Sequence, residues 1–202
     1  LSSDEARSEG LREVLTRSSD ATAQSDVLSG ILRGFEGRRR VDMPHYWNEC
    51  YARFQNSEND DVRRRSIQLA LIFDDKSAIE QLKSVAEDRS AKLADRTVAI
   101  DSLVASKVAG FATVLQSLID DEAVLPSVLR GLAEYEHPDT VKTILGQYSK
   151  MPVAARQQAI QTLASRSDWA RYLLDEIEAR RIARSDVPAF TARQVRNLGD
   201  AR

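Results

Sequence analysis

Apolar residues recur along the chain every three or four positions, and short polar segments interrupt this pattern at regular intervals. Such spacing places the apolar side chains on one face of a helix. Only two or three residues separate most neighbouring segments, and connections that short make consecutive helices antiparallel. The pattern predicts helices over residues 3–17, 20–38, 42–56, 59–73, 76–88, 91–105, 108–119, 122–135, 138–149, 152–166, 168–181 and 186–199.

Residues that favour helix starts stand at several of these boundaries. Ser77 and Glu80 have the spacing of a capping box, with Asp75 as a competing cap. Asp60 and Asp61 open the helix that continues into three arginines, where acidic residues complement the helix dipole. Pro138 suits the first turn of a helix. These signals support the helical boundaries.

One line of residues recurs within the helical pattern. It consists of an arginine, a small residue three positions later, an aliphatic residue and a further apolar residue. A two-helix unit of this size cannot bury both of its apolar faces alone, whereas stacked copies bury them in one continuous core. The repeat therefore predicts an all-α fold, an α–α superhelix of the HEAT or armadillo type with about six antiparallel helical hairpins. The copies are Arg63-Ser66-Ile67-Ala70, Arg96-Ala99-Ile100-Leu103, Leu125-Val128-Leu129-Leu132 and Arg156-Ala159-Ile160-Leu163, with starts 33, 29 and 31 residues apart.

Two resemblances follow from these residues. The segment 61–71, followed by Asp74-Asp75-Lys76-Ser77, resembles the short HEAT-like repeat of phycobilisome lyases, and the likeness extends over about residues 59–180. Pro44 with Trp47, the repeats and the stretch 184–198 also resemble the HEAT-repeat region of large exported bacterial proteins. Those proteins couple a dehydrogenase-like β-propeller to a c-type haem domain. This second resemblance implies a periplasmic or exported location and leaves a cytoplasmic one open.

The same patterns predict one HEAT-like domain over residues 1–202. Residues 1–58 form divergent N-terminal repeats, residues 59–181 hold the clearest repeats, and residues 182–202 form a C-terminal capping helix. The chain begins at Leu1, so we expect a fragment of a longer protein, whose parent could be an enzyme. The fragment itself has no Cys-x-x-Cys-His haem motif and no propeller repeat, so dehydrogenase or haem function does not carry over to it.

Composition narrows the function classes. Of 202 residues, 42% are hydrophobic and 30% charged, and the scarcity of glycine (8) and proline (5) favours long helices. The net charge of −2 makes nucleic acid an unfavoured partner. The longest apolar run, Leu69 to Phe73, falls far short of the roughly 20 residues that a membrane span needs. We therefore expect no membrane span in this sequence.

Catalytic and metal-binding patterns are not recognisable. His45 and Cys50 lie five positions apart and do not share a helix face well, so a buried free cysteine is the preferred interpretation over a nucleophile pair. The only other histidine, His137, has no partner at ligand spacing. The carboxylate pairs all fall at helix junctions, where caps explain them. We predict no catalytic, cofactor-binding or metal-binding residue and no cofactor. The pairs are Asp60–Asp61, Asp74–Asp75 and Asp120–Asp121.

The arginines carry the remaining functional hypotheses. Arg63, Arg96 and Arg156 share one repeat position and predict either a ladder of inter-repeat bonds or a ligand-binding row on a concave face. We expect a non-catalytic interaction or spacer domain that binds a partner protein or neighbouring domains of its own chain. The alternative is a nucleic-acid-binding solenoid resembling HEAT-like DNA glycosylases. It would use a basic patch made of Arg38, Arg39, Arg40, Arg64 and Arg65.

Overall fold

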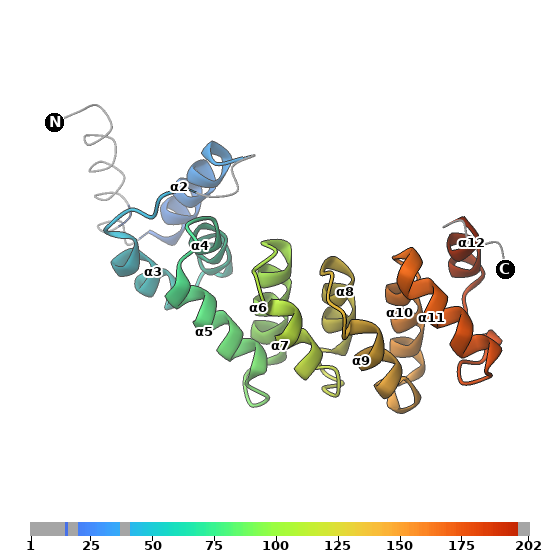
Figure 1. The fold of residues 1–202 in the computed structure, drawn as a ribbon. Coiled ribbons are helices and arrows are strands. Elements are labelled where there is room, and N and C mark those ends of the chain that lie inside the picture. Colours follow the sequence, from blue (N-terminus) through green and yellow to red (C-terminus); the bar gives the residue numbers. More distant parts are fainter. Residues whose placement is uncertain (1–14, 16–19, 37–40, 198–202) are drawn as a thin grey trace. The chain divides into compact units, whose positions relative to one another are not determined.

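The computed structural model describes residue 15 and residues 20–36 and 41–197 (Figure 1). These residues hold eleven α-helices and no strand, which confirms the all-α prediction. The chain divides into two compact units, residues 1–82 (unit 1) and residues 83–202 (unit 2). Within the described residues, no helix is long and apolar enough to cross a membrane.

The helices agree closely with those predicted from periodicity. Two short 3-10 helices, η1 (Tyr148–Lys150) and η2 (Arg184–Asp186), follow α9 and α11. The helix predicted over 3–17 lies outside the described residues except for buried Leu15. The α-helices are α2 (Ala21–Gly34), α3 (Trp47–Gln55), α4 (Asp60–Ile72), α5 (Lys76–Glu87), α6 (Leu93–Ala105), α7 (Phe111–Ser117), α8 (Leu125–Glu134), α9 (Thr140–Gln147), α10 (Val153–Leu163), α11 (Ser167–Glu178) and α12 (Ala189–Asn197).

Several helices begin two to five residues later than predicted, and proline explains the late starts of α3 and α12. A residue before proline is displaced from helical backbone angles towards extended ones. Val187 is extended ahead of Pro188, so α12 begins at Ala189 after the separate turn η2. Likewise, α3 begins at Trp47, whose N–H donates to the carbonyl of Pro44.

In unit 1, α2 and α3 both pack against α4. The core is rich in aromatic rings, and the Trp47 and Phe73 rings meet edge to face with centroids 4.9 Å apart. Cys50 is buried within this cluster and forms no disulfide, as the sequence indicated. Leu28 and Leu69 complete the core from α2 and α4. Thus the aromatic residues of α3 hold unit 1 together.

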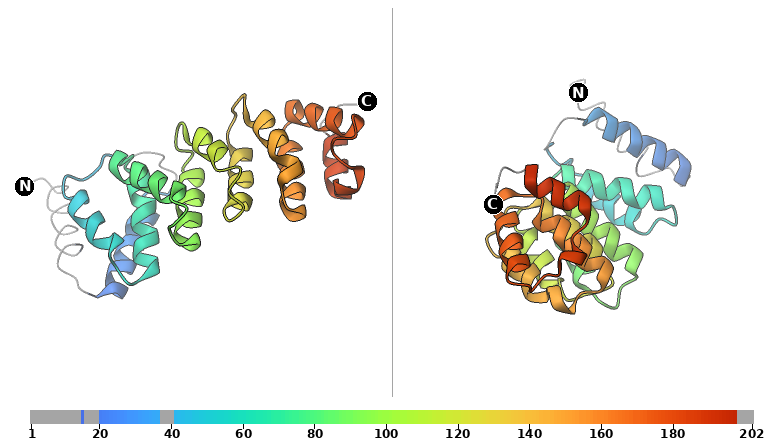
Figure 2. Two further views of the ribbon diagram at one scale, coloured as in Figure 1. Left: turned by 90° about the horizontal axis from the view of Figure 1, so that it is seen from below. Right: turned by 90° about the vertical axis from the view of Figure 1, so that its right-hand side faces the viewer.

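In unit 2, the first helices of successive hairpins, α6, α8 and α10, contact one another in chain order (Figures 1 and 2). The second helices pack beside them, with α7 against α8 and α11 against α10. The aliphatic positions of the sequence repeat are buried in α6, α8 and α10. The aliphatic residues that are fully buried in this way are Ile100, Leu103, Val128, Leu129, Leu132, Ile160 and Leu163.

Hydrogen bonds in unit 2 join residues about one hairpin apart. Thr162 Oγ1 donates to the carbonyl of Leu129, 33 positions earlier, at 2.9 Å. The Tyr135 hydroxyl donates to the carbonyl of Leu103 at 3.2 Å, across 32 positions. Both bonds therefore join segments more than 30 positions apart in the sequence. Two further bonds of this kind run from Arg166 to the Ala133 carbonyl and from Gln194 to the Ala164 carbonyl.

Three helices end in a left-handed residue that is not glycine. Asp74, Lys107 and Arg180 follow α4, α6 and α11 with φ of 54°, 50° and 59°. After Arg180, the N–H of Arg181 donates to the carbonyl of Glu176, five positions back, as in a Schellman motif. These turns satisfy carbonyl groups that the helix ends would leave unpaired.

Candidate functional site

Arg96 connects two successive turns of unit 2. Its Nε and Nη2 donate to the carbonyl of Ala86, near the end of α5, at 3.1 and 2.9 Å. Nη2 also donates to Oδ2 of Asp121 at 2.7 Å, in the turn between α7 and α8. Only 3% of the Arg96 side chain is exposed. A buried guanidinium needs such partners, because leaving a charge unpaired inside a protein is costly. Its donors are therefore directed inward and not towards a ligand.

Arg89 extends this network to the surface. Its Nη2 lies 2.7 Å from Oδ1 of Asp120, and its Nε lies 3.7 Å from Oδ2 of Asp121. Asp121 also caps the turn, because its Oδ1 accepts from the N–H of Ala123. Two arginines and two aspartates thus join the turn before α6 to the turn before α8. We call these four residues the turn network: Arg89, Arg96, Asp120 and Asp121.

The other two arginines of the repeat position make simpler contacts. Arg156 donates to the carbonyls of Met151 at 2.9 Å and Ser149 at 3.1 Å, both just before α10. Arg63 donates to the carbonyl of Ser57, before α4, and to the Asp60 carboxylate. Each arginine therefore bonds to a backbone carbonyl that precedes its own helix. Among the described contacts of these three arginines, the bond from Arg96 to Asp121 is the one that reaches a carboxylate beyond the next helix. The ladder and the ligand row stay predictions for this set.

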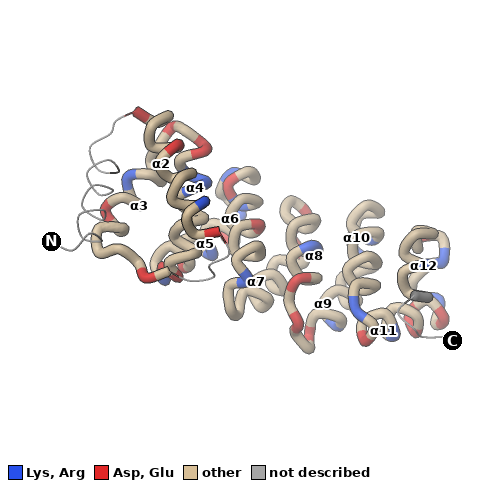
Figure 3. The backbone as a smooth tube through the Cα atoms, turned by 90° about the horizontal axis from the view of Figure 1, so that it is seen from above, with Lys and Arg blue, Asp and Glu red and all other residues tan. Residues whose placement is uncertain are grey.

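The arginines of the proposed basic patch have internal partners where the structure describes them. Arg64 pairs with Asp61 one turn earlier on α4. Arg65 Nη1 donates to the backbone carbonyl of Ser25 on α2 at 2.6 Å. Arg38, Arg39 and Arg40 lie outside the described residues. Along α6–α12, short basic and acidic segments alternate (Figure 3).

The histidines and the single cysteine lie in different surroundings. The exposed His45 ring contacts Tyr46, with centroids 5.4 Å apart, and Cys50 is buried in the core of unit 1. His137 Nδ1 lies 2.9 Å from Nε2 of Gln116 and accepts from the N–H of Asp139 at 3.2 Å. Across the described ranges, no three His, Cys, Asp or Glu residues are grouped to hold a metal ion.

The caps of α5 and α4 are an aspartate and an asparagine. Asp75 Oδ1 accepts from the N–H groups of Ser77 and Ala78 at 3.0 and 3.2 Å, so Asp75 is the cap of α5. Asn59, one residue before Asp60, caps α4. The sequence analysis identified the competing Asp75 cap but missed Asn59, whose side chain is an equally good acceptor for a helix N-terminus.

Three buried or half-buried tyrosines have raised pKa values. Burial, together with a hydrogen bond from the Tyr148 hydroxyl to Asp186 at 3.1 Å, raises the pKa of Tyr148 to about 12. Burial and the nearby charge of Glu134 raise the pKa of Tyr135 to about 12. Burial and the charge of Asp75 do the same for Tyr51. In each case, loss of water around the phenol is the first cause, because it disfavours the ionised form.

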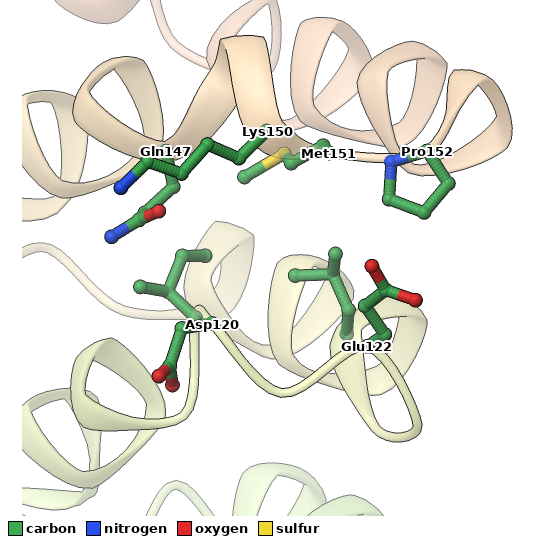
Figure 4. A pocket seen from close by; sticks show the side chains of 8 residues that line it. Asp120, Glu122, Gln147, Lys150, Met151 and Pro152 are labelled. Carbon is green, nitrogen blue, oxygen red and sulfur yellow. The ribbon is translucent and has the colours of Figure 1, made fainter.

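A hollow of about 240 Å³ lies between two turns of unit 2 (Figure 4). One wall comes from the turn between α7 and α8, and the other comes from the end of α9, η1 and the start of α10. No local sequence pattern predicts this site, because its residues come from two turns more than 20 positions apart. The lining residues are Ile119, Asp120, Glu122, Leu125, Gln147, Lys150, Met151 and Pro152, and we call the site the turn hollow.

Comparison of the chain with known protein families, curated proteins and solved structures gave no match.

Proposed function

We propose that the chain is a HEAT-like helical solenoid that serves as a non-catalytic protein-interaction or spacer domain within a larger protein. The observation that carries the proposal is the serial contact of α6, α8 and α10, together with hydrogen bonds between residues about one hairpin apart. Stacked hairpins offer long, continuous surfaces, and repeat proteins use such surfaces to bind partners.

Large exposed apolar side chains in unit 2 support a binding role. Leu93 and Val153, the first residues of α6 and α10, are 51% and 67% exposed. Tyr172 on α11 and Phe190 on α12 are 57% and 59% exposed. Aromatic side chains contribute large contact areas and are enriched in protein interfaces. Such residues suit a protein partner better than a partner that is bound through charges alone.

Nucleic-acid binding is the second candidate, and the internal pairing of the described arginines weighs against it. Nucleic-acid affinity depends on cationic groups that are free to replace the counterions of phosphates. Arg63 and Arg64 already face Asp60 and Asp61, and Arg65 faces Ser25. We expect no salt-dependent change in the fluorescence anisotropy of labelled duplex DNA, even at low ionic strength. Binding that weakens steeply with salt would favour this second candidate.

The proposed function is tested by finding a partner and rebuilding the complex from purified components. Proteins cross-linked to the chain in its native host would be identified, purified and measured against the chain by calorimetry. A variant with Leu93→Ser, Val153→Ser, Tyr172→Ser and Phe190→Ser should weaken binding at least tenfold, which corresponds to about 1.4 kcal/mol. The control changes four exposed polar residues: Gln68→Ser, Gln81→Ser, Gln157→Ser and Lys142→Ser. A purified partner that binds both variants equally would contradict these surfaces, and no reconstituted complex at all would contradict the binding function.

A further inference from the structure

The turn hollow has a mixed lining, in which apolar side chains of two turns lie among polar and charged ones. Ile119 and Leu125 line it from one turn, and Met151 and Pro152 line it from the other. Ile119, Leu125 and Met151 are almost wholly buried, so each presents only a narrow strip of surface. Because these side chains are fixed by core packing, the walls exist before any ligand arrives. A preformed apolar surface binds with little loss of conformational entropy.

Charged groups stand at different ends of the hollow. In Figure 4 the Lys150 ammonium lies beside the Gln147 amide, whereas the Glu122 carboxylate lies near Pro152 at the other end. The Asp120 carboxylate points away from the hollow, consistent with its 2.7 Å contact to Arg89. Within the described part of the chain, the side chains of Glu122 and Lys150 take part in no hydrogen bond or ion pair. One positive and one negative group are therefore available to a ligand.

The size of the hollow limits the ligand. Its volume is about 240 Å³. Sites for drug-sized molecules and cofactors start at about 300 Å³. One apolar side chain with its adjoining backbone suits the space better. Ala123 and Val153, which follow the lining residues Glu122 and Pro152 in the sequence, are exposed.

We propose that the turn hollow binds an extended segment of a partner protein, in which an apolar side chain lies between an acidic and a basic one. The apolar side chain packs against Ile119, Leu125 and Met151. The acidic group pairs with the Lys150 ammonium and accepts from the Gln147 amide, and the basic group pairs with Glu122. This inference rests on the proposed interaction function and adds the place and the chemistry of recognition.

The test is a titration of the isotope-labelled whole chain, followed by two-dimensional NMR, with short blocked peptides. A Gly-Glu-Leu-Lys-Gly peptide should shift amide signals of residues 119–125 and 147–153. Replacing leucine by serine should weaken binding at least tenfold, because the apolar contact is lost. The like-charged peptides, Glu-Leu-Glu and Lys-Leu-Lys, should each bind about threefold to tenfold more weakly, since an exposed ion pair contributes up to about 1 kcal/mol.

Protein variants make the assignment specific. Glu122→Gln and Lys150→Gln should each weaken binding of the Glu-Leu-Lys peptide about threefold to tenfold. Matched controls at exposed residues outside the hollow, Glu178→Gln and Lys142→Gln, should leave it unchanged. The exchanged pair Glu122→Lys with Lys150→Glu should restore most of the affinity, because the segment can bind in the reverse direction. Restoration would also exclude simple unfolding of the single variants.

Defined outcomes overturn the inference. The first is that no amide signal shifts at millimolar peptide, or that the shifts spread over the whole chain. The second is that the serine peptide, or free leucine, binds as tightly as the Glu-Leu-Lys peptide. Failure here is distinct from failure of the proposed function. If a purified partner binds the Glu122→Gln/Lys150→Gln variant with unchanged affinity, the hollow is not the site and the interaction function stands.

Discussion

The guanidinium of Arg96 lies 2.7 Å from the carboxylate of Asp121, and both groups are buried in unit 2. The two residues are 25 positions apart, on the first helix of one hairpin and in the turn that leads to the next. The bond therefore fixes the spacing of two successive hairpins. A second bond from the same guanidinium, to the Ala86 carbonyl, holds the preceding helix end.

Replacing Arg96 by methionine should lower the free energy of unfolding by about 3 kcal/mol. The substitution keeps most of the side-chain length but leaves the buried Asp121 carboxylate with only the more distant Arg89, and a buried charge that loses its partner costs about 3–5 kcal/mol. Urea unfolding followed by circular dichroism measures the change. Arg156→Met is the matched control, with an expected loss of about 1 kcal/mol, because its partners are carbonyls and it is only partly buried. Equal losses would contradict the special role of the Arg96–Asp121 pair.

Replacing Gly131 by alanine should destabilise the protein by about 1 kcal/mol. A Cβ at this position on α8 would lie 2.8 Å from Cγ2 of Val104, which is too close. A β-branched side chain has little rotamer freedom to move aside, and overpacking costs about 1–3 kcal/mol. The gain in helix propensity offsets up to about 1 kcal/mol of that cost. Thermal unfolding measures the net effect.

Gly146→Ala is the matched control for the Gly131 substitution. Gly146 lies in α9, and a Cβ there meets nothing within 4 Å. This variant should gain about 0.5–1 kcal/mol from propensity alone. If Gly131→Ala stabilised the protein as much as Gly146→Ala, the predicted steric cost of a Cβ at Gly131 would be contradicted.

Replacing Arg180 by glycine should stabilise the protein by about 0.5–1 kcal/mol. Arg180 has φ of 59°, and left-handed backbone costs a residue with a Cβ about 1 kcal/mol that glycine avoids. Arg180→Ala keeps the Cβ and should give no such gain. Differential scanning calorimetry on both variants separates the backbone effect from loss of the charge. Equal stability of the Arg180→Gly and Arg180→Ala variants would contradict the explanation from backbone conformation.

Stability should fall as the pH rises from about 10 to 12. The pKa of Tyr51, Tyr135 and Tyr148 is about 12 in the folded chain and about 10 in an unfolded one, so the folded state binds these protons more tightly. That contribution is complete below pH 10 and disappears as the pH passes through 12. Unfolding in urea at several alkaline pH values measures it.

Tyrosinate absorbance provides an independent check of the alkaline prediction. Three of the five tyrosines should ionise only near pH 12, and Tyr148→Phe should remove one of these three late steps. Ionisation of all five tyrosines near pH 10 in the folded protein would contradict the effect of burial.

A defect in the middle of unit 2 should spread only to neighbouring hairpins if the stacking is of the solenoid type. Leu129 on α8 is fully buried, and Leu→Ala in a core costs about 2–5 kcal/mol. Hydrogen exchange of the Leu129→Ala variant should rise in α6–α10 and stay closer to normal in α2–α4, because each repeat contacts only its neighbours. A uniform rise over all helices would instead indicate one cooperative globule.

Periodicity predicted the helices well because apolar spacing and helix burial are directly linked, as at Ile100 and Ile160. Helix starts near Pro44 and Pro188 were less well predicted, since a proline constrains the residue before it as well as its own backbone. Contacts between distant positions were beyond the sequence. Arg65 and Ser25 are 40 residues apart, and no local pattern pairs them.

The candidate site was predicted least well. The arginine at position 96 was identified from the repeat, but its acidic partner was not, because Asp121 was explained by a capping role alone. Asp121 performs both functions: its Oδ1 accepts from the N–H of Ala123 in the turn, and its Oδ2 accepts from Arg96. The turn hollow depends on how two turns approach each other, and that distance is set by core packing that a single sequence does not display.

The hydrogen bonds between hairpins of unit 2 also bear on how the chain acquires its structure. The carbonyl of Leu129 accepts from Thr162, and the carbonyl of Leu103 accepts from Tyr135. Each carbonyl can therefore be paired once about 33 further residues have been synthesised. Contacts of such limited sequence separation carry a small loop-closure cost and favour rapid folding. A growing polypeptide can therefore add each hairpin to the one already formed, and its exposed apolar surface is covered soon after it emerges from the ribosome.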